Sequence, residues 1–132
     1  MTYILLAVLF NPPYTGEPCT VSWYGDSFHG QLTASGRVYD QEEMTCAHKT
    51  LPLGSLVEFT NVTSGESWVL WVTDRGPYVE GRDFDFSRGA FREIIGDLNV
   101  GVDQNSLNFR VVGRETKGLL YNLATQPLRT ER

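Results

Sequence analysis

The sequence predicts a mainly β protein: a small, closed or nearly closed β-barrel with one short helix. Gly and Pro interrupt the 132-residue chain at short intervals. The segments between them are short and rich in Val, Phe, Trp and Thr, which favour strands. Apolar residues at helical spacing indicate one helix, close to Ser87. A chain of this length accommodates a single domain with one core.

The clearest local signal is a β-hairpin in the middle of the chain. Residues 54–62 (GSLVEFTNV) alternate, with Val57 and Phe59 on one face. Residues 63–66 (TSGE) form a turn that contains Gly, and residues 67–74 (SWVLWVTD) follow as a strand apolar enough to be buried on both faces. We therefore expect the two segments to pair as a hairpin.

Further elements are expected on either side of the hairpin. Residues 19–25 (CTVSWYG) alternate and predict an early strand, and residues 107–113 (LNFRVVG) predict a late one. Ser87 is suited to cap a helix, and Gly96 is suited to end it. The stretch DFS before the helix is expected to be strand or loop. The apolar positions at helical spacing are Ala90, Phe91, Ile94 and Ile95.

The predicted domain organisation is an apolar arm over residues 1–18, a barrel over 19–113 and a second arm over 114–132. The apolar run from Tyr3 to Phe10 is too short to cross a bilayer, which takes roughly 20 residues, and no Lys or Arg precedes it. We interpret it as an uncleaved edge strand or docking segment, and a degenerate export signal stays open. Both arms are candidate docking sites for protein partners.

Charge and cysteine content exclude several classes of protein. The net charge of −5 and a pI near 4.9 argue against nucleic acid and against acidic membrane surfaces as partners. Cys19 and Cys46 are too few for a zinc site or a disulfide scaffold. One disulfide and two buried thiols fit them equally well. Because the chain has no recognised metal or nucleotide motif, we expect no metal or cofactor.

Residues 71–87 (WVTDRGPYVEGRDFDFS) hold four carboxylates between apolar flanks. Asp74 ends a strand and Asp85 lies eleven positions later, so a loop that folds back would bring both to one cleft. Paired carboxylates are typical of glycosidic cleavage. Phe84 or Phe86 would raise the pKa of an acid by desolvation, whereas the helix N-terminus would lower it. The structural alternative is that Asp74 orders its own turn and Asp85 caps the helix.

The two histidines are the remaining titratable candidates. His48, in CAHKTLPLG, is either a structural histidine or a proton carrier and carboxylate partner near neutral pH. His29, in DSFHGQLTASG, is expected to be structural.

Four separated motifs resemble one known family. SWYGDSFHGQLTASGRVYD, TCAHKTLPLGSLVEFTN, VTDRGPY and DFSRGAF resemble the rare lipoprotein A family, the double-psi β-barrel lytic transglycosylases of peptidoglycan. FDFSRGAF also resembles a segment of expansins. The resemblance covers residues 19 to 113. It implies a six-stranded double-psi barrel and a polysaccharide groove. It also implies cleavage between N-acetylmuramic acid and N-acetylglucosamine that leaves a 1,6-anhydro end, without metal or cofactor.

The resemblance also implies roles for particular residues. Asp85 and Asp74 are the expected catalytic pair, with Asp85 the proton shuttle, and His48 would orient or tune one of them. The family has Glu where this chain has Arg37. Asp40, Glu42 and Glu43 are the candidates to compensate for that change, and pairing of Arg37 with either catalytic aspartate would lower its pKa. The expected substrate-binding residues are Trp23, Tyr24, Tyr78 and Arg37, with a core position as the alternative for Trp23.

Two functions from different classes follow. The first is a lytic transglycosylase that acts on peptidoglycan outside the cytoplasm, in the bacterial envelope or as part of a phage virion. The virion setting is suggested by the two arms and by the missing lipoprotein signal and peptidoglycan-binding repeat. The alternative is a non-catalytic barrel that binds glycan or serves as a structural subunit of a larger assembly. Arg37 and the arms favour this alternative, whereas Asp74, Asp85 and His48 favour the enzyme.

Overall fold

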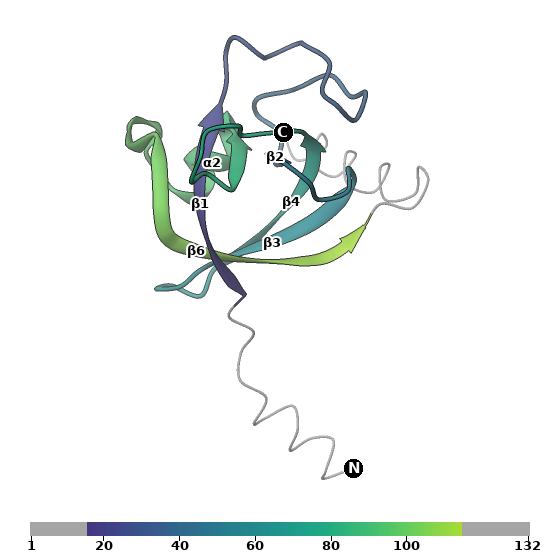
Figure 1. The fold of residues 1–132 in the computed structure, drawn as a ribbon. Helices are drawn as coiled ribbons and strands as arrows, with labels where there is room; N and C mark the ends of the chain where they lie inside the picture. Colours follow the sequence, from purple (N-terminus) through teal and green to yellow (C-terminus); the bar gives the residue numbers. More distant parts are fainter. Residues whose placement is uncertain (1–15, 115–132) are drawn as a thin grey trace, which may run out of the picture.

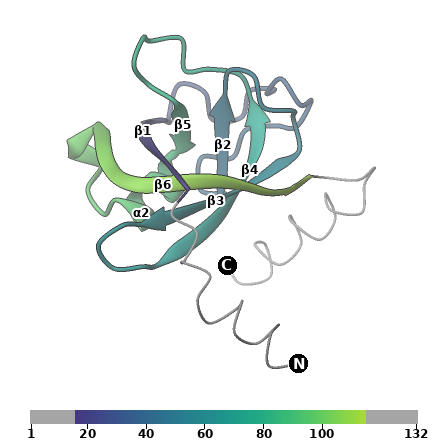
Figure 2. The ribbon, with the colours of Figure 1, turned by 60° about the horizontal axis from the view of Figure 1, so that its bottom comes forward.

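The computed structural model describes residues 16–114, which form a closed barrel of six strands in the order β1-β5-β2-β4-β3-β6 (Figures 1 and 2). The predicted mainly β, six-stranded barrel is confirmed. The apolar run from Tyr3 to Phe10 and nearly all of both predicted arms lie outside the described residues. The strands are β1 (Glu17–Tyr24), β2 (Thr45–His48), β3 (Ser55–Asn61), β4 (Ser67–Asp74), β5 (Phe84–Ser87) and β6 (Val102–Arg114).

The predicted hairpin is present as β3 and β4, which pair antiparallel. Val57 and Phe59 are fully buried, as the alternation predicts. The prediction that the second strand is buried on both faces is right only from Leu70 onward, because Val69 is 47% exposed. The reason lies in the pairing: β2 joins β4 only from Trp71 on. The first half of β4 therefore has β3 as its one neighbour.

The barrel interior is an aromatic core. The Phe59 ring contacts those of Phe84 and Phe86 edge-on, at centroid distances of 4.9 and 4.8 Å. Cys19 and Cys46 are free thiols buried in the same core, so the disulfide alternative is wrong. Burial, with a smaller effect of nearby acidic charge, raises the pKa of the Cys19 thiol to about 12, which keeps it protonated.

The α-helix within residues 16–114 is α2 (Arg88–Ile94), and both of its ends follow the sequence prediction. The Ser87 Oγ accepts a hydrogen bond from the Ala90 N–H at 3.1 Å. Gly96 follows the helix with a φ of +98°, a conformation that glycine adopts without strain. The stretch before the cap is strand β5. A 3₁₀ turn, η1 (Leu98–Val100), leads from the helix into β6.

Candidate active site

Sheet register places two of the predicted residues in one row across four neighbouring strands. Ser22 of β1 pairs with Asp85 of β5, Asp85 pairs with Ala47 of β2, and Ala47 pairs with Asp74 of β4. We call these four residues the carboxylate row. Register partners share a face, and strands lie roughly 4.8 Å apart, so the Asp85 and Asp74 backbones are about 10 Å apart with Ala47 between them in the row.

The carboxylate row lies on the outer face of the barrel. The residues that alternate with it, Phe84, Phe86 and Cys46, are fully buried in the interior core. Ala47 instead packs in a second, smaller cluster with Tyr24 and Tyr39. The row is thus walled by this tyrosine pair and is separate from the main core.

Asp85 is partly buried, and its carboxylate has few polar contacts within the protein. Its Oδ1 accepts a hydrogen bond from the Ser22 hydroxyl at 3.1 Å. Burial raises the pKa of Asp85 to about 6, although the Ser22 hydrogen bond and the charge of Arg82 oppose the shift, and the charge of Asp74 adds to it. Desolvation therefore outweighs any effect of the helix N-terminus. The alternative that Asp85 caps the helix is wrong, because Ser87 does so.

Asp74 is held by backbone donors. Its Oδ1 accepts hydrogen bonds from the N–H groups of Arg75 at 2.9 Å and Ala34 at 3.0 Å. The Ser35 N–H donates to the Thr73 carbonyl at 3.0 Å, beside these bonds. Asp74 thus orders its own turn, as the structural alternative predicts, and it also anchors the loop at residues 33–36 to the end of β4.

The structure does not bring His48 together with the two aspartates. Its register partner is Phe84, so its side chain lies on the face opposite to that of Ala47 and Asp85. The ring packs against Phe84 at 4.7 Å, and Nδ1 accepts hydrogen bonds from two N–H groups at the start of the next loop. Burial, then the charge of Lys49, lowers the pKa of His48. The setting is that of a structural histidine.

The predicted sugar-stacking aromatics have three different settings. Tyr24 is 8% exposed and stacks on Tyr39 at 4.3 Å, which leaves no open ring face for a sugar. Trp23 points to the other side of β1, where its indole N–H donates to the Leu98 carbonyl at 3.0 Å, so the alternative of a packing role fits it. Tyr78 is 77% exposed in the loop between β4 and β5 and keeps an open ring.

Arg37 does not reach a substrate surface in this structure. Its side chain is 8% exposed, and Nη2 lies 3.2 and 3.1 Å from the two carboxylate oxygens of Glu43. The guanidinium also lies over the Trp71 ring, 4.4 Å from its centroid. The buried pairing is therefore with Glu43, and the arginine whose charge opposes the rise in the pKa of Asp85 is Arg82.

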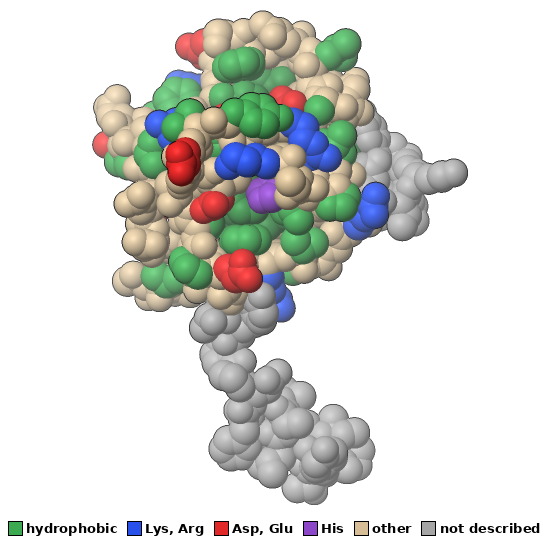
Figure 3. All heavy atoms as spheres, viewed as in Figure 1, with side chains coloured by type: hydrophobic (Ala, Val, Ile, Leu, Met, Phe, Trp, Pro, Cys, Tyr) green, Lys and Arg blue, Asp and Glu red, His purple; other side chains and the backbone are tan. Residues whose placement is uncertain are grey.

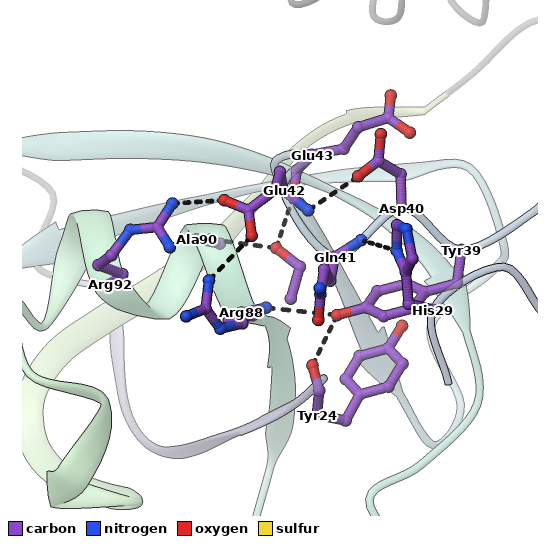
Figure 4. A network of polar contacts seen from close by, with 11 residues as sticks. Tyr24, His29, Tyr39, Asp40, Gln41, Glu42, Glu43, Arg88, Ala90 and Arg92 are labelled. Atoms are coloured by element: carbon purple, nitrogen blue, oxygen red, sulfur yellow. Dashed lines mark hydrogen bonds and ion pairs between the residues drawn. The ribbon is translucent and has the colours of Figure 1, made fainter. Parts of the chain in front are cut away.

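The other two candidates to compensate for Arg37 belong to a network beside α2 (Figure 4). The Glu42 carboxylate forms ion pairs with Arg88, at 3.1 Å, and with Arg92. Asp40 Oδ1 accepts a hydrogen bond from the Glu42 N–H at 2.9 Å. The Tyr39 hydroxyl accepts from the Arg88 N–H and donates to the Tyr24 carbonyl at 2.6 Å. His29 accepts a hydrogen bond from the Gln41 N–H there, which gives it the structural role predicted for it.

Sequence reasoning missed Ser22, Ala47, Tyr39 and Arg82 as parts of the site. Ser22 and Ala47 are common residue types whose contribution comes from register alone. Within residues 16–114, no group of three or more His, Cys, Asp or Glu side chains is placed to hold a metal ion. In the same part of the chain, no helix has the length and apolar character needed to cross a bilayer.

A six-stranded barrel of this kind defines the double-psi β-barrel class, and solved structures share the fold. The Streptomyces papain inhibitor is similar with a TM-score of 0.58 and 23% identity, over 77% of this chain and 98% of that one. A point mutant of the Clavibacter michiganensis expansin, in complex with cellohexaose, has a TM-score of 0.57 and 15% identity, over 76% of this chain and 52% of that one. At these identities the likeness is one of fold.

Within that class, the chain belongs to the family described as "Lytic transglycolase", whose family model matches residues 18–102. The endolytic peptidoglycan transglycosylase RlpA of Vibrio cholerae is 42% identical over 110 residues, 83% of this chain and 41% of that protein. RlpA of Pseudomonas aeruginosa is 51% identical over 75 residues, 57% of this chain and 22% of that protein. The probable RlpA of Synechocystis is 49% identical over 87 residues, 66% of this chain and 27% of that protein. The chain spans less than half the length of these relatives, and they lend no support to a virion role.

Proposed function

We propose that this chain cleaves the glycan strands of peptidoglycan as a lytic transglycosylase, outside the cytoplasm in the bacterial envelope, with Asp85 as the proton shuttle. The bond cleaved joins N-acetylmuramic acid to N-acetylglucosamine, and the product has a 1,6-anhydro end. Family membership and the RlpA relatives support the reaction class. The observation that carries the proposal is the partly buried Asp85 carboxyl, whose pKa is raised to about 6.

The chemistry asks Asp85 to give and then to take one proton. The protonated carboxyl donates to the glycosidic oxygen as the bond to the anomeric carbon breaks. The C6 hydroxyl of the same sugar then attacks the anomeric carbon, and the Asp85 carboxylate removes the hydroxyl proton. No water is consumed, and Asp85 ends protonated as it began. A pKa near the working pH serves both halves of this exchange.

Asp74 and Ser22 support Asp85 in this proposal. The negative charge of Asp74 raises the pKa of Asp85 and favours the positive charge that develops on the sugar ring. The Ser22 hydroxyl fixes one oxygen of Asp85, which leaves the other for the substrate. His48 acts indirectly, since its Nδ1 orders the loop that begins with Lys49. Tyr78 is the aromatic with an open face for a sugar.

The test is digestion of purified sacculi, with the products identified by mass spectrometry. We expect anhydro-ended fragments from the unaltered chain and a loss of roughly 100-fold or more for Asp85→Asn. Glu80→Gln, which changes an exposed acid in the same loop, is the matched control and should keep activity. Because the acid must hold its proton, kcat/KM should fall as the pH rises above about 6.

The second candidate is a non-catalytic barrel that binds wall glycan. It is favoured by the loss of a carboxylate at position 37, since Glu43 neutralises Arg37 and does not restore a free acid there. The same digestion separates the two candidates. Sacculi that retain the protein but release no fragments at any pH between about 4 and 8, a range that spans the Asp85 titration, would leave the binding function and remove the catalytic one.

A further inference from the structure

Three cations at one end of the barrel differ from the other cations with described partners. Lys49, Arg75 and Arg82, which we call the cation cluster, form no ion pair with any carboxylate in the described part of the chain. The ion pairs found there all use arginines that do not belong to the cation cluster. These pairs are Arg37–Glu43, Arg88–Glu42, Arg92–Glu42 and Arg110–Glu58.

The topology gathers the cation cluster beside the carboxylate row. Lys49 follows β2, Arg75 follows β4 and Arg82 precedes β5. Because β2 and β4 are parallel and β5 is antiparallel to β2, these three positions lie at the same end of the barrel. Each cation is within three residues of a member of the row. Figure 3 shows a face on which Lys and Arg side chains gather beside a histidine.

Backbone carbonyls hold two of these cations in place without neutralising them. The Lys49 Nζ donates to the Arg82 carbonyl at 2.5 Å. The Arg75 Nη1 donates to the Leu51 carbonyl at 2.6 Å and to the His48 carbonyl at 3.3 Å. These bonds join the loop after β2 to the loop after β4. A carbonyl fixes a side chain but carries no net charge, so Lys49 and Arg75 keep their positive charge in a preorganised arrangement.

The positive charge reaches the candidate active site. The charge of Arg82 opposes the rise in the pKa of Asp85 that burial causes. Burial, with the charges of Lys49 and Arg75, lowers the pKa of His48, and the charge of Asp83 opposes this shift. Asp83 lies in the same loop as Arg82, and its Oδ2 accepts a hydrogen bond from the Thr20 N–H at 2.8 Å, which leaves its negative charge beside the cations. The whole chain carries a net charge of −5 and repels an anionic polymer at long range. A local group of cations is the feature that lets such a protein accept an anion at this end.

We infer that the cation cluster binds a carboxylate carried by the glycan strand, next to the bond that Asp85 cleaves. The inference rests on the proposed function for its substrate class. A muramic acid residue carries a lactyl carboxylate when no peptide is attached, and a peptide attached there carries carboxylates of its own. In both cases the group bound is an anion carried on a substituent of the sugar whose glycosidic bond is cleaved. A neutral glycan offers no such group.

The test measures binding apart from cleavage, with every protein carrying Asp85→Asn. The ligands are peptide-free peptidoglycan strands, peptide-bearing strands and neutral N-acetylglucosamine oligomers of matched length. Arg82→Gln and Lys49→Gln should each weaken binding of the anionic strands about three- to tenfold and reduce its salt dependence. Binding of the neutral oligomers should not change. Arg110→Gln, on β6 away from this end, is the matched control and should behave as the parent.

The outcomes separate this inference from the proposed function. Tighter parent binding of peptide-free strands identifies the lactyl carboxylate, and tighter binding of peptide-bearing strands identifies a peptide carboxylate. Equal losses for neutral and anionic ligands, or no loss for either variant, would overturn the inference even if the unaltered chain cleaves sacculi. Charge-dependent binding by a chain that releases no fragments would keep the inference and reject catalysis.

Discussion

Two neighbouring regions of this barrel treat their polar groups in opposite ways. Beside α2, Glu42 bridges Arg88 and Arg92 (Figure 4), and Arg37 is buried against Glu43. Although burial raises it, the hydrogen bonds from Arg92 and Arg88 bring the pKa of Glu42 below its usual value. In the carboxylate row the opposite holds, since burial lifts the pKa of Asp85 well above its usual value.

The paired charges beside α2 stabilise the fold, whereas the carboxylate row holds the groups that the candidate site would use. The ion pairs of Glu42 with Arg88 and Arg92 hold the segment at residues 37–43 to the helix, and the Arg37–Glu43 pair joins the two ends of that segment. Through the Tyr39 hydroxyl, that network also fixes the tyrosine pair that walls the row. The row itself retains a destabilised acid, Asp85, and beside it the buried Tyr24 hydroxyl has no hydrogen-bond partner among residues 16–114. Unfavourable groups that persist in a folded protein are typical of functional sites.

The largest expected effect on stability comes from breaking the buried pair. Glu43→Gln leaves the Arg37 guanidinium buried without this counter-charge, and we expect a loss of about 3–5 kcal/mol in the free energy of unfolding. Glu42→Gln, at a pair whose side chains are a third or more exposed, should lose about 1 kcal/mol or less. Urea unfolding of both variants measures the contrast. Equal losses would show that burial does not distinguish the two pairs.

The carboxylate row should respond in the opposite direction. Asp85→Asn removes a carboxylate whose ionised form is disfavoured in the folded state, so we expect it to stabilise the protein at pH 7 by about 2 kcal/mol, discounted for partial exposure. The pKa is raised on folding, so stability of the unaltered chain falls as the pH rises from about 4 to 6 and then levels. The gain from Asp85→Asn should therefore vanish at about pH 4. Thermal unfolding at the two pH values tests this, and a gain that is the same at both would contradict it.

The sequence predicts the β3–β4 hairpin and the two ends of α2 better than it predicts the carboxylate row. The β3–β4 alternation and the Ser87 and Gly96 ends of α2 are local patterns, and the structure confirms them. Strands β2 and β5 are only four residues long, too short for a periodic signal. The row depends on the register between such strands, which no local pattern specifies. Glu43 was one of three candidates near Arg37, and only packing distinguishes it.

The smallest expected effects are those at the Tyr24–Tyr39 pair. They sharpen the comparison, because removing the hydroxyl should raise the stability of the protein at one of the two stacked rings and lower it at the other. Tyr24→Phe removes a buried hydroxyl with no partner among the described residues, so we expect a gain of about 1 kcal/mol. Tyr39→Phe deprives the Tyr24 carbonyl and the Arg88 N–H of their partner and should lose about as much.

The activity of the two tyrosine variants on sacculi should rank in the opposite order to their stability. If the buried Tyr24 hydroxyl contributes to the site beyond packing, Tyr24→Phe should lose roughly tenfold in kcat/KM while gaining stability. Tyr39→Phe should lose stability first, with activity near that of the parent at temperatures where it is folded. A Tyr24→Phe variant that is both more stable and fully active would show that the buried hydroxyl belongs to packing alone. The contrast between the two regions would then rest on Asp85.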